Sequence, residues 1–234
     1  MWSRGPSHAA WKGSIALTSD PAFAIRRYSV QDRPDVRRIS VQTALMGEPG
    51  SAFFDDDEIL ADALTLYFTD HEPGSCFVAV CGGKVAGYVL GARDARRMDR
   101  ICAAKVLPSL LLKALCRGTF LRKKNARFLF HVFLSLLKGE FRAPVFSKEY
   151  PAALHINIDR EFRSAGVGSA LIQAYLEDLK RQAVKGVHFA TMSGKAALFF
   201  EKNGFQLLFR GRRTYFRYFL GKDVPLSIYG MRIA

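Results

Sequence analysis

The segment around residue 160 constrains the fold more than any other part of the chain. Leu154–Ile158 (LHINI) alternates apolar and polar residues, which is typical of a strand. The glycine-containing turn Arg163–Ser169 (RSAGVGS) follows, and a helix is predicted from about Ser169 to Ala183. A strand that turns through two glycines directly into a helix predicts an α/β architecture.

The remaining pattern places this unit within a larger sheet. We predict further strands at residues 23–28, 76–81, 85–91, 187–191, 205–209 and 227–233, and further helices at 34–45, 59–68 and 196–203. Gly82-Gly83 between two apolar runs indicates a hairpin. This order of elements predicts a mixed sheet with helices on both faces.

Composition narrows the class of protein. The chain has 234 residues with 49% hydrophobic and 24% charged residues, which excludes disordered and collagen-like classes. The four cysteines show no zinc-like spacing, so we expect free thiols in a reducing compartment and no metal site. Because no signal peptide or apolar span of membrane length is visible, we expect a cytoplasmic protein with a tail at residues 1–22 and one domain at 23–234.

Most of the net charge of +14 lies in one stretch. Residues 93–148 contain 14 Lys+Arg against three acidic residues, and we treat 93–149 as a basic insertion with helices at about 101–116 and 126–138. Three interpretations are open: an insertion packed on the core, a surface that contacts an anionic membrane or a second copy in a homodimer, and a nucleic-acid contact. The last is the weakest, because no nucleic-acid motif is present.

The turn after the strand has the properties of an anion site. Gly166 and Gly168 allow backbone N–H groups to converge, and the following helix adds its unpaired N–H groups and its dipole. Such a site suits a pyrophosphate. Arg163 can contact the anion or fix the loop. The turn lacks the Gly-Lys-Ser/Thr that ends a P-loop and the third glycine of the dinucleotide-binding motif G-x-G-x-x-G, so it matches neither motif.

Two motifs resemble the GNAT superfamily of N-acetyltransferases. Arg163-x-x-Gly166-x-Gly168 is similar to the acyl-CoA signature R/Q-x-x-G-x-G/A, and Ala196–Phe205 (AALFFEKNGF) is similar to the segment A-x-x-x-Y-x-K-x-G-F. The hairpin ending in Val85–Tyr88 also resembles the second and third strands of that family. The resemblance covers residues 23–233 except the insertion.

This resemblance implies a mostly antiparallel sheet that splays between its fourth and fifth strands, with acetyl-CoA in the gap. The pantetheine arm would pair with the strand through Ile156 and Ile158. The pyrophosphate would bind the N–H groups of Ser164, Ala165, Gly166, Val167, Gly168 and Ser169, with Arg163 beside them. Ser193 and Phe200 match further cofactor-binding positions.

The sequence departs from the family at two of these positions. Phe200 stands where the family often has a tyrosine that protonates the departing thiolate. Ser193 stands where the family often has an asparagine, and its hydroxyl could still form a hydrogen bond with pantetheine. Another group or solvent would then supply the proton, since a thiol pKa of about 8–9 makes thiolate a fair leaving group. The other interpretation is a domain that binds acyl-CoA without turnover.

A base must take a proton from an attacking amine. His155 and Asn157 share one face of their strand, so we expect His155 to be the base, with a pKa near 6.5, and Asn157 to orient it. The alternative is a structural histidine bonded within the sheet.

Two charged runs are ambiguous. The acidic run at residues 55–58 either attracts a cationic acceptor or starts a helix with a solvated face. Arg210, Arg212, Arg213 and Arg217 either contact the 3′-phosphate of CoA or are exposed loop residues.

The predicted activity is transfer of an acetyl or short acyl group from acetyl-CoA to a primary amine of a small molecule or peptide by direct attack. A catalytically weak or inactive acyl-CoA-binding module is the alternative.

Overall fold

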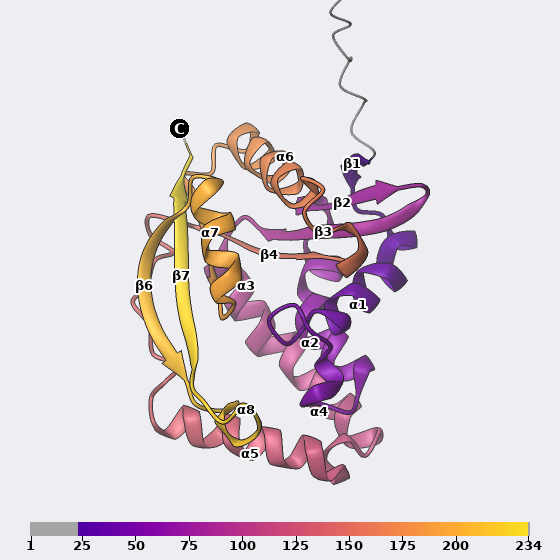
Figure 1. Cartoon of the computed structure of the whole chain (residues 1–234), viewed down its shortest axis with the longest axis vertical. Helices are drawn as coiled ribbons and strands as arrows, with labels where there is room; N and C mark the ends of the chain where they lie inside the picture. Colours follow the sequence, from indigo (N-terminus) through magenta and orange to yellow (C-terminus); the bar gives the residue numbers. More distant parts are fainter. Residues whose placement is uncertain (1–22, 234) are drawn as a thin grey trace, which may run out of the picture.

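A seven-stranded sheet organises the chain (Figure 1), which was analysed as a computed structural model that describes residues 23–233. The strand order is β1-β2-β3-β4-β5-β7-β6. The strands are β1 (Ala24–Arg27), β2 (Cys76–Cys81), β3 (Lys84–Ala92), β4 (Ala152–Ile158), β5 (Gly186–Thr191), β6 (Gln206–Arg213) and β7 (Val224–Arg232). All seven predicted strands are confirmed, and the predicted tail, residues 1–22, lies outside the described residues.

The sheet opens between β4 and β5, as expected. Every other neighbouring pair is antiparallel, whereas β4 and β5 are parallel and pair only through Ala152–Val187 and Ala153–His188. Beyond these two pairs the strands diverge toward their carboxyl ends. The result is a mixed, mostly antiparallel sheet with a gap in its middle.

Helices cover both faces of the sheet. On one face, α1 (Arg33–Gln42) and α2 (Asp57–His71) pack over β3, and residues of α1, α2, β2 and β3 share one apolar cluster. On the other, α6 (Val167–Arg181) and α7 (Gly194–Lys202) cover the larger core cluster. Apolar residues at helical spacing, such as Leu171, Tyr175 and Leu179 of α6, are fully buried there.

The basic insertion leaves the sheet between β3 and β4 and packs beside α2. It contains α3 (Ala95–Ile101), a π-helical turn (Cys102–Val106), α4 (Leu107–Cys116), a 3₁₀ turn (Thr119–Leu121) and α5 (Lys123–Leu137). The predicted helix start near residue 101 is wrong, because Asp94 caps a helix that begins at Ala95. The π turn lies just before Pro108, which lacks an N–H donor.

The insertion is held to the core by both apolar packing and ion pairs. Ala114 and Leu110 of α4 and Phe128 of α5 join a cluster that includes Phe53 and Phe54. The ion pairs join three basic residues of the insertion to the start of α2: Lys113 to Asp62 at 2.7 Å, Arg117 to Asp56 at 3.0 Å and Lys124 to Asp55 at 2.6 Å. The insertion is therefore packed on the core, and these contacts leave its outer surface open to a further partner.

The acidic run starts α2, as one of its two interpretations expects, and Asp55, Asp57 and Glu58 are exposed whereas Asp56 is buried. Asp56 is the N-cap, and its buried carboxylate accepts hydrogen bonds from the Ile59 N–H, Arg117 and Thr119. Burial alone would raise the pKa of this carboxyl, but the hydrogen bonds hold it below its usual value. Basic residues of the insertion thus compensate most of the charge of the run.

One short element had no sequence signal: α8 (Arg217–Leu220) lies between β6 and β7 and packs its flanking aromatic residues against the insertion. Within residues 23–233, none of the helices has both the length and the apolar character needed to cross a bilayer.

We expect Asp56→Ala to destabilise the fold by about 2 kcal/mol, because it removes the cap of α2 and leaves the buried Thr119 hydroxyl without its acceptor. Urea unfolding of the purified variant measures this. Asp57→Ala is the matched control, since that neighbouring carboxylate is exposed. Equal losses for the two variants would contradict the role given to Asp56.

Candidate active site

The gap between β4 and β5 presents free main-chain groups. The Asp159 N–H donates to the Ala86 carbonyl, so the alternating pattern of an antiparallel pair directs odd-numbered β4 residues toward β3. The N–H and C=O groups of Ile156 and Ile158 therefore face the gap, and among these four groups the Ile158 carbonyl accepts a hydrogen bond from Arg163 at 3.4 Å. These are the two residues expected to pair with an extended pantetheine arm.

The glycine turn lies at the end of β4 where the gap is open, and it leads directly into α6. Gly166 is the N-cap of α6 with a φ of +79°, and Ser164 also has a positive φ of +69°. The Ala170 N–H is the first to bond back within the turn, to the Gly166 carbonyl, so the N–H groups of Val167, Gly168 and Ser169 have no partner in the helix. With the helix dipole they form an anion site.

Arg163 fixes this loop. Its guanidinium donates to the Gly47 carbonyl at 2.8 Å and to the Ile158 carbonyl at 3.4 Å. Gly47 belongs to the connection between α1 and α2, where a second link joins Arg160 to Glu48. Of the two roles considered for Arg163, its contacts correspond to the structural one.

A close approach across the gap was not visible in the sequence. A Cβ on Gly168 would lie 2.9 Å from the Phe199 ring of α7, with Ile158 next nearest. Phe199 thus reaches from the β5 side to the start of α6. A side chain at 168 would require the Phe199 ring to shift, so glycine at this position has a packing reason of its own.

The two departures from the family pattern lie on the β5 side. Phe200 is buried in an aromatic cluster, with its ring 4.3 Å from that of Phe189 and 6.1 Å from that of Tyr229. Ser193 precedes α7 and makes no side-chain cap, so its hydroxyl is not committed to the helix. Tyr215 lies nearby and donates to the Met192 sulfur at 3.3 Å.

His155 and Asn157 lie on the same face of β4, as predicted, beneath α1 and α2. The Asn157 amide nitrogen is 2.9 Å from the Tyr88 hydroxyl and 2.7 Å from His155 Nε2. Because Nε2 accepts from an amide, this assignment puts the ring proton on Nδ1. Tyr88, a fully buried residue of β3, is the member of this group that sequence analysis did not single out.

The environment of His155 differs from the one expected. Burial lowers its pKa to about 4, so the expected value near 6.5 is wrong and the ring is neutral at pH 7. Its Nε2 lone pair is also occupied by Asn157. As it stands, the arrangement matches a histidine bonded within the sheet.

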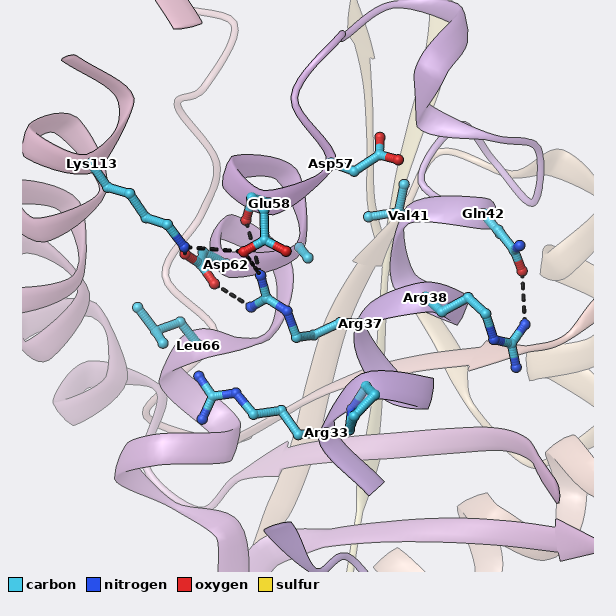
Figure 2. A pocket seen from close by; sticks show the side chains of 12 residues that line it. Arg33, Arg37, Arg38, Val41, Gln42, Asp57, Glu58, Asp62, Leu66 and Lys113 are labelled. Carbon is cyan, nitrogen blue, oxygen red and sulfur yellow. Dashed lines mark hydrogen bonds and ion pairs between the residues drawn. The ribbon is translucent and has the colours of Figure 1, made fainter. Parts of the chain in front are cut away.

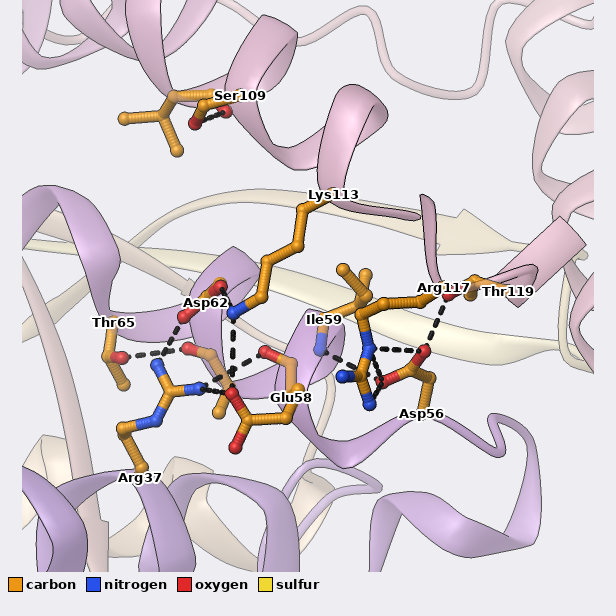
Figure 3. A network of polar contacts seen from close by, with 12 residues as sticks. Arg37, Asp56, Glu58, Ile59, Asp62, Thr65, Ser109, Lys113, Arg117 and Thr119 are labelled. Atoms are coloured by element: carbon orange, nitrogen blue, oxygen red, sulfur yellow. Dashed lines mark hydrogen bonds and ion pairs between the residues drawn. The ribbon is translucent and has the colours of Figure 1, made fainter. Parts of the chain in front are cut away.

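A cleft of about 790 Å³ lies between α1, α2 and α4 (Figure 2). Charged side chains cross it in alternating order: Arg37 bonds both Glu58 and Asp62, and Lys113 bonds the same two carboxylates (Figure 3). Asp62 keeps a lowered pKa despite the opposing effect of burial, because Lys113 and Arg37 donate to it. The cleft wall is thus polar but nearly charge-balanced.

Three of the four arginines considered for the 3′-phosphate of CoA make contacts within the protein. Arg212 and Arg217 pair with Asp223, and Arg213 donates to the Glu140 carbonyl of the insertion. The first two contacts lie at the β6–β7 connection, and the third ties the end of β6 to the insertion.

Comparison with known proteins identifies the family. The sequence profile of the Acetyltransferase (GNAT) family matches residues 40–205, which is more than half of the chain and includes the glycine turn and all of α7.

Solved structures agree with the fold. SsHAT is 24% identical, with a TM-score of 0.65 over 92% of this chain and 100% of that one. A polyamine N-acetyltransferase of Drosophila melanogaster that forms N-acetylagmatine is 14% identical, with a TM-score of 0.58 over 90% and 99%. The yncA protein of Salmonella typhimurium, solved with its cofactor acetyl-CoA, is 12% identical, with a TM-score of 0.55 over 91% and 95%. The chain therefore belongs to the GNAT family of N-acetyltransferases.

Proposed function

We propose that this protein binds acetyl-CoA along β4 and transfers the acetyl group to a primary amine of a small molecule or peptide, which attacks the thioester directly. The observation that carries the proposal is the gap between β4 and β5 with an anion-binding helix terminus at its open end. The gap leaves strand main-chain groups without strand partners, and the start of α6 leaves helix N–H groups unbonded at the same place.

The residues present fit this ligand. Ile156 and Ile158 offer main-chain donors and acceptors to an amide-containing arm, and the turn at 164–169 offers N–H groups to a diphosphate. Arg163 ties that turn to Gly47 and to the end of β4. On the β5 side, we assign Ser193 a hydroxyl contact to the arm and Phe200 a supporting role in the apolar core behind it.

His155 and Asn157 are our proposed catalytic pair. A neutral His155 accepts a proton only if Asn157 releases Nε2, so we assign Asn157 the role of orienting the ring and yielding its place to the amine. A conjugate acid with a pKa near 4 does not retain the proton, and His155 would therefore pass it to water. The amine must then arrive unprotonated.

The acidic run at residues 55–58 does not form a strongly negative site for the acceptor amine. The carboxylates of the acidic run are paired with Lys113, Arg117 and Lys124, and they leave Asp57 as its member without an ion pair among residues 23–233. This balance favours an acceptor of modest charge over a polycation.

Acceptor-dependent release of CoA tests the function. With acetyl-CoA and a panel of primary amines (aliphatic amines, amino sugars, peptide N-termini and lysine peptides), we expect at least one amine to raise thiol release above the rate with buffer alone. Tight binding of CoA without any amine-dependent release would instead identify a non-catalytic acyl-CoA-binding module, for which Phe200 in place of tyrosine is the supporting observation.

Gly166→Ala should weaken CoA binding at least tenfold, because a side chain at a φ of +79° forces the turn to move and its N–H groups diverge. Calorimetric titration with CoA measures this. Gly83→Ala is a matched control: Gly83 has a φ of +80°, nothing lies within 4 Å of its Cβ position either, and it sits in the β2–β3 hairpin. Similar losses of affinity in both variants would show that the turn does not hold the diphosphate.

His155→Gln should lower kcat by roughly a hundredfold and leave KM for acetyl-CoA unchanged, because it removes the group that takes the amine proton. Steady-state kinetics of CoA release measures both constants. Unchanged kcat would leave His155 a structural residue.

The same substitution tests the burial of His155. The folded pKa near 4 lies below the unfolded value of about 6.5, so the unfolded state binds more protons between these values. Wild-type stability should therefore fall by up to about 3 kcal/mol as pH drops from 6.5 to 4. His155→Gln should lack this part of the loss in urea unfolding. Parallel pH curves for both proteins would contradict the lowered pKa.

A further inference from the structure

The basic insertion presents a large apolar surface to solvent. Of the 14 large hydrophobic side chains that are exposed among residues 23–233, all but Val30 and Leu198 lie in residues 107–145. Isolated exposed apolar residues are normal on a protein surface, but a concentration in one segment marks an interaction site.

Helix α5 carries the clearest part of this surface. Its inner side is fixed to the protein: Asn125 bonds the Asp55 N–H and the Thr119 carbonyl, Phe128 packs on Phe53, and Ser135 bonds Glu140. These contacts are sufficient to hold the helix against the rest of the protein. The opposite side therefore has no structural reason within the described fold to be apolar.

That opposite side is nonetheless apolar. Ala126, Phe130, Phe133 and Leu137 are spaced by four, three and four residues, which places them on one face. Phe130, Phe133 and Leu137 are 57%, 54% and 68% exposed. Leu121, just before α5, is 87% exposed. We name the face formed by residues 126, 130, 133 and 137 the outer α5 face.

Basic residues flank the outer α5 face. At 100° per residue, Lys123, Arg127 and Lys138 project along one side of it. None of the three has a carboxylate partner among residues 23–233. In contrast, Lys113 and Arg117 at the end of α4 and Lys124 of α5 pair with carboxylates near the start of α2. Arg127 lies over the Tyr218 ring, 4.8 Å from its centre. Residues 100–139 contain no Asp or Glu at all.

We propose that the outer α5 face binds the surface of an anionic lipid bilayer. Apolar side chains on one side of a helix with unpaired cations at its flank are what a helix lying in a membrane interface requires. The cations gain from the negative surface potential, and the aromatic and leucine side chains enter the acyl boundary. Figure 1 shows α5 lying across one end of the molecule, away from α6, α7 and the strands β1–β3.

The charge of the face argues for lipid over a second copy of the chain. A two-fold contact through the outer α5 face would bring Lys123, Arg127 and Lys138 of both copies together, and no acidic residue in 100–139 could compensate them. A nucleic-acid duplex would satisfy the cations but would leave Phe130 and Phe133 uncovered, because its bases are already stacked on one another. An anionic bilayer satisfies both groups of residues.

Vesicle sedimentation tests this proposal independently of any enzymatic activity. In 50 mM NaCl we expect the full chain to partition onto phosphatidylcholine vesicles containing 30% phosphatidylserine at least tenfold more strongly than onto pure phosphatidylcholine, and to lose most of this binding in 500 mM NaCl. A chain that remains in the supernatant with the anionic vesicles at low salt overturns the proposal.

Variants separate the apolar and the electrostatic contributions. Phe130→Ser with Phe133→Ser should reduce partitioning at least tenfold, and Val30→Ser with Leu198→Ser, which removes exposed apolar groups elsewhere, should not. Lys123→Glu with Lys138→Glu should abolish binding, whereas Lys84→Glu with Lys180→Glu, an equal charge change at other exposed sites, should reduce it much less.

Folding of each variant is verified by its circular dichroism and its unfolding midpoint. Binding that survives the loss of Phe130 and Phe133 would show that the apolar face is not involved and would refute the proposal. A stable dimer that dissociates on the same substitution, in a chain that ignores vesicles, would likewise refute it and identify a second copy as the occupant.

Discussion

The site depends on how little β4 and β5 are joined. Two residue pairs hold the parallel strands together, and beyond them each strand has one unpaired edge inside a sheet whose other neighbouring strands are joined by four or more residue pairs. Unpaired main-chain groups in a protein interior require a partner. A ligand with amide groups can provide it, and the glycine turn at the end of β4 adds N–H groups suited to the phosphates of the same ligand. The sheet and the site are therefore one structural feature.

Much of this could be predicted from the sequence because the signals are local. Alternation in Leu154–Ile158 predicted a strand with His155 and Asn157 on one face, and Gly166 predicted the turn that opens α6. Local signals also missed the start of α3, where Asp94 acts as a cap, and the short α8. Boundaries depend on single hydrogen bonds and are harder to infer than the elements themselves.

Features that depend on distant parts of the chain could not be inferred. The approach of Phe199 to Gly168, the bond from Arg163 to Gly47 and the hydrogen bond of Tyr88 with Asn157 each join residues far apart in sequence. The pKa of His155 is a further case, since burial and not the residue type determines it. Charge counting identified the insertion, but only the folded arrangement shows that part of its charge compensates the acidic start of α2.

The position of the insertion has a consequence for how the chain assembles. Strands β3 and β4 are neighbours in the sheet, yet residues 93–151 separate them along the chain. Closing a loop of this length costs only slightly more entropy than closing one half as long, because the cost grows with the logarithm of loop length. The rate is affected more than the equilibrium, since contacts between remote segments form slowly. Strands β2 and β3, which are joined by Gly82-Gly83, can pair early, whereas the half of the sheet that begins at β4 must join them after a long excursion of the chain.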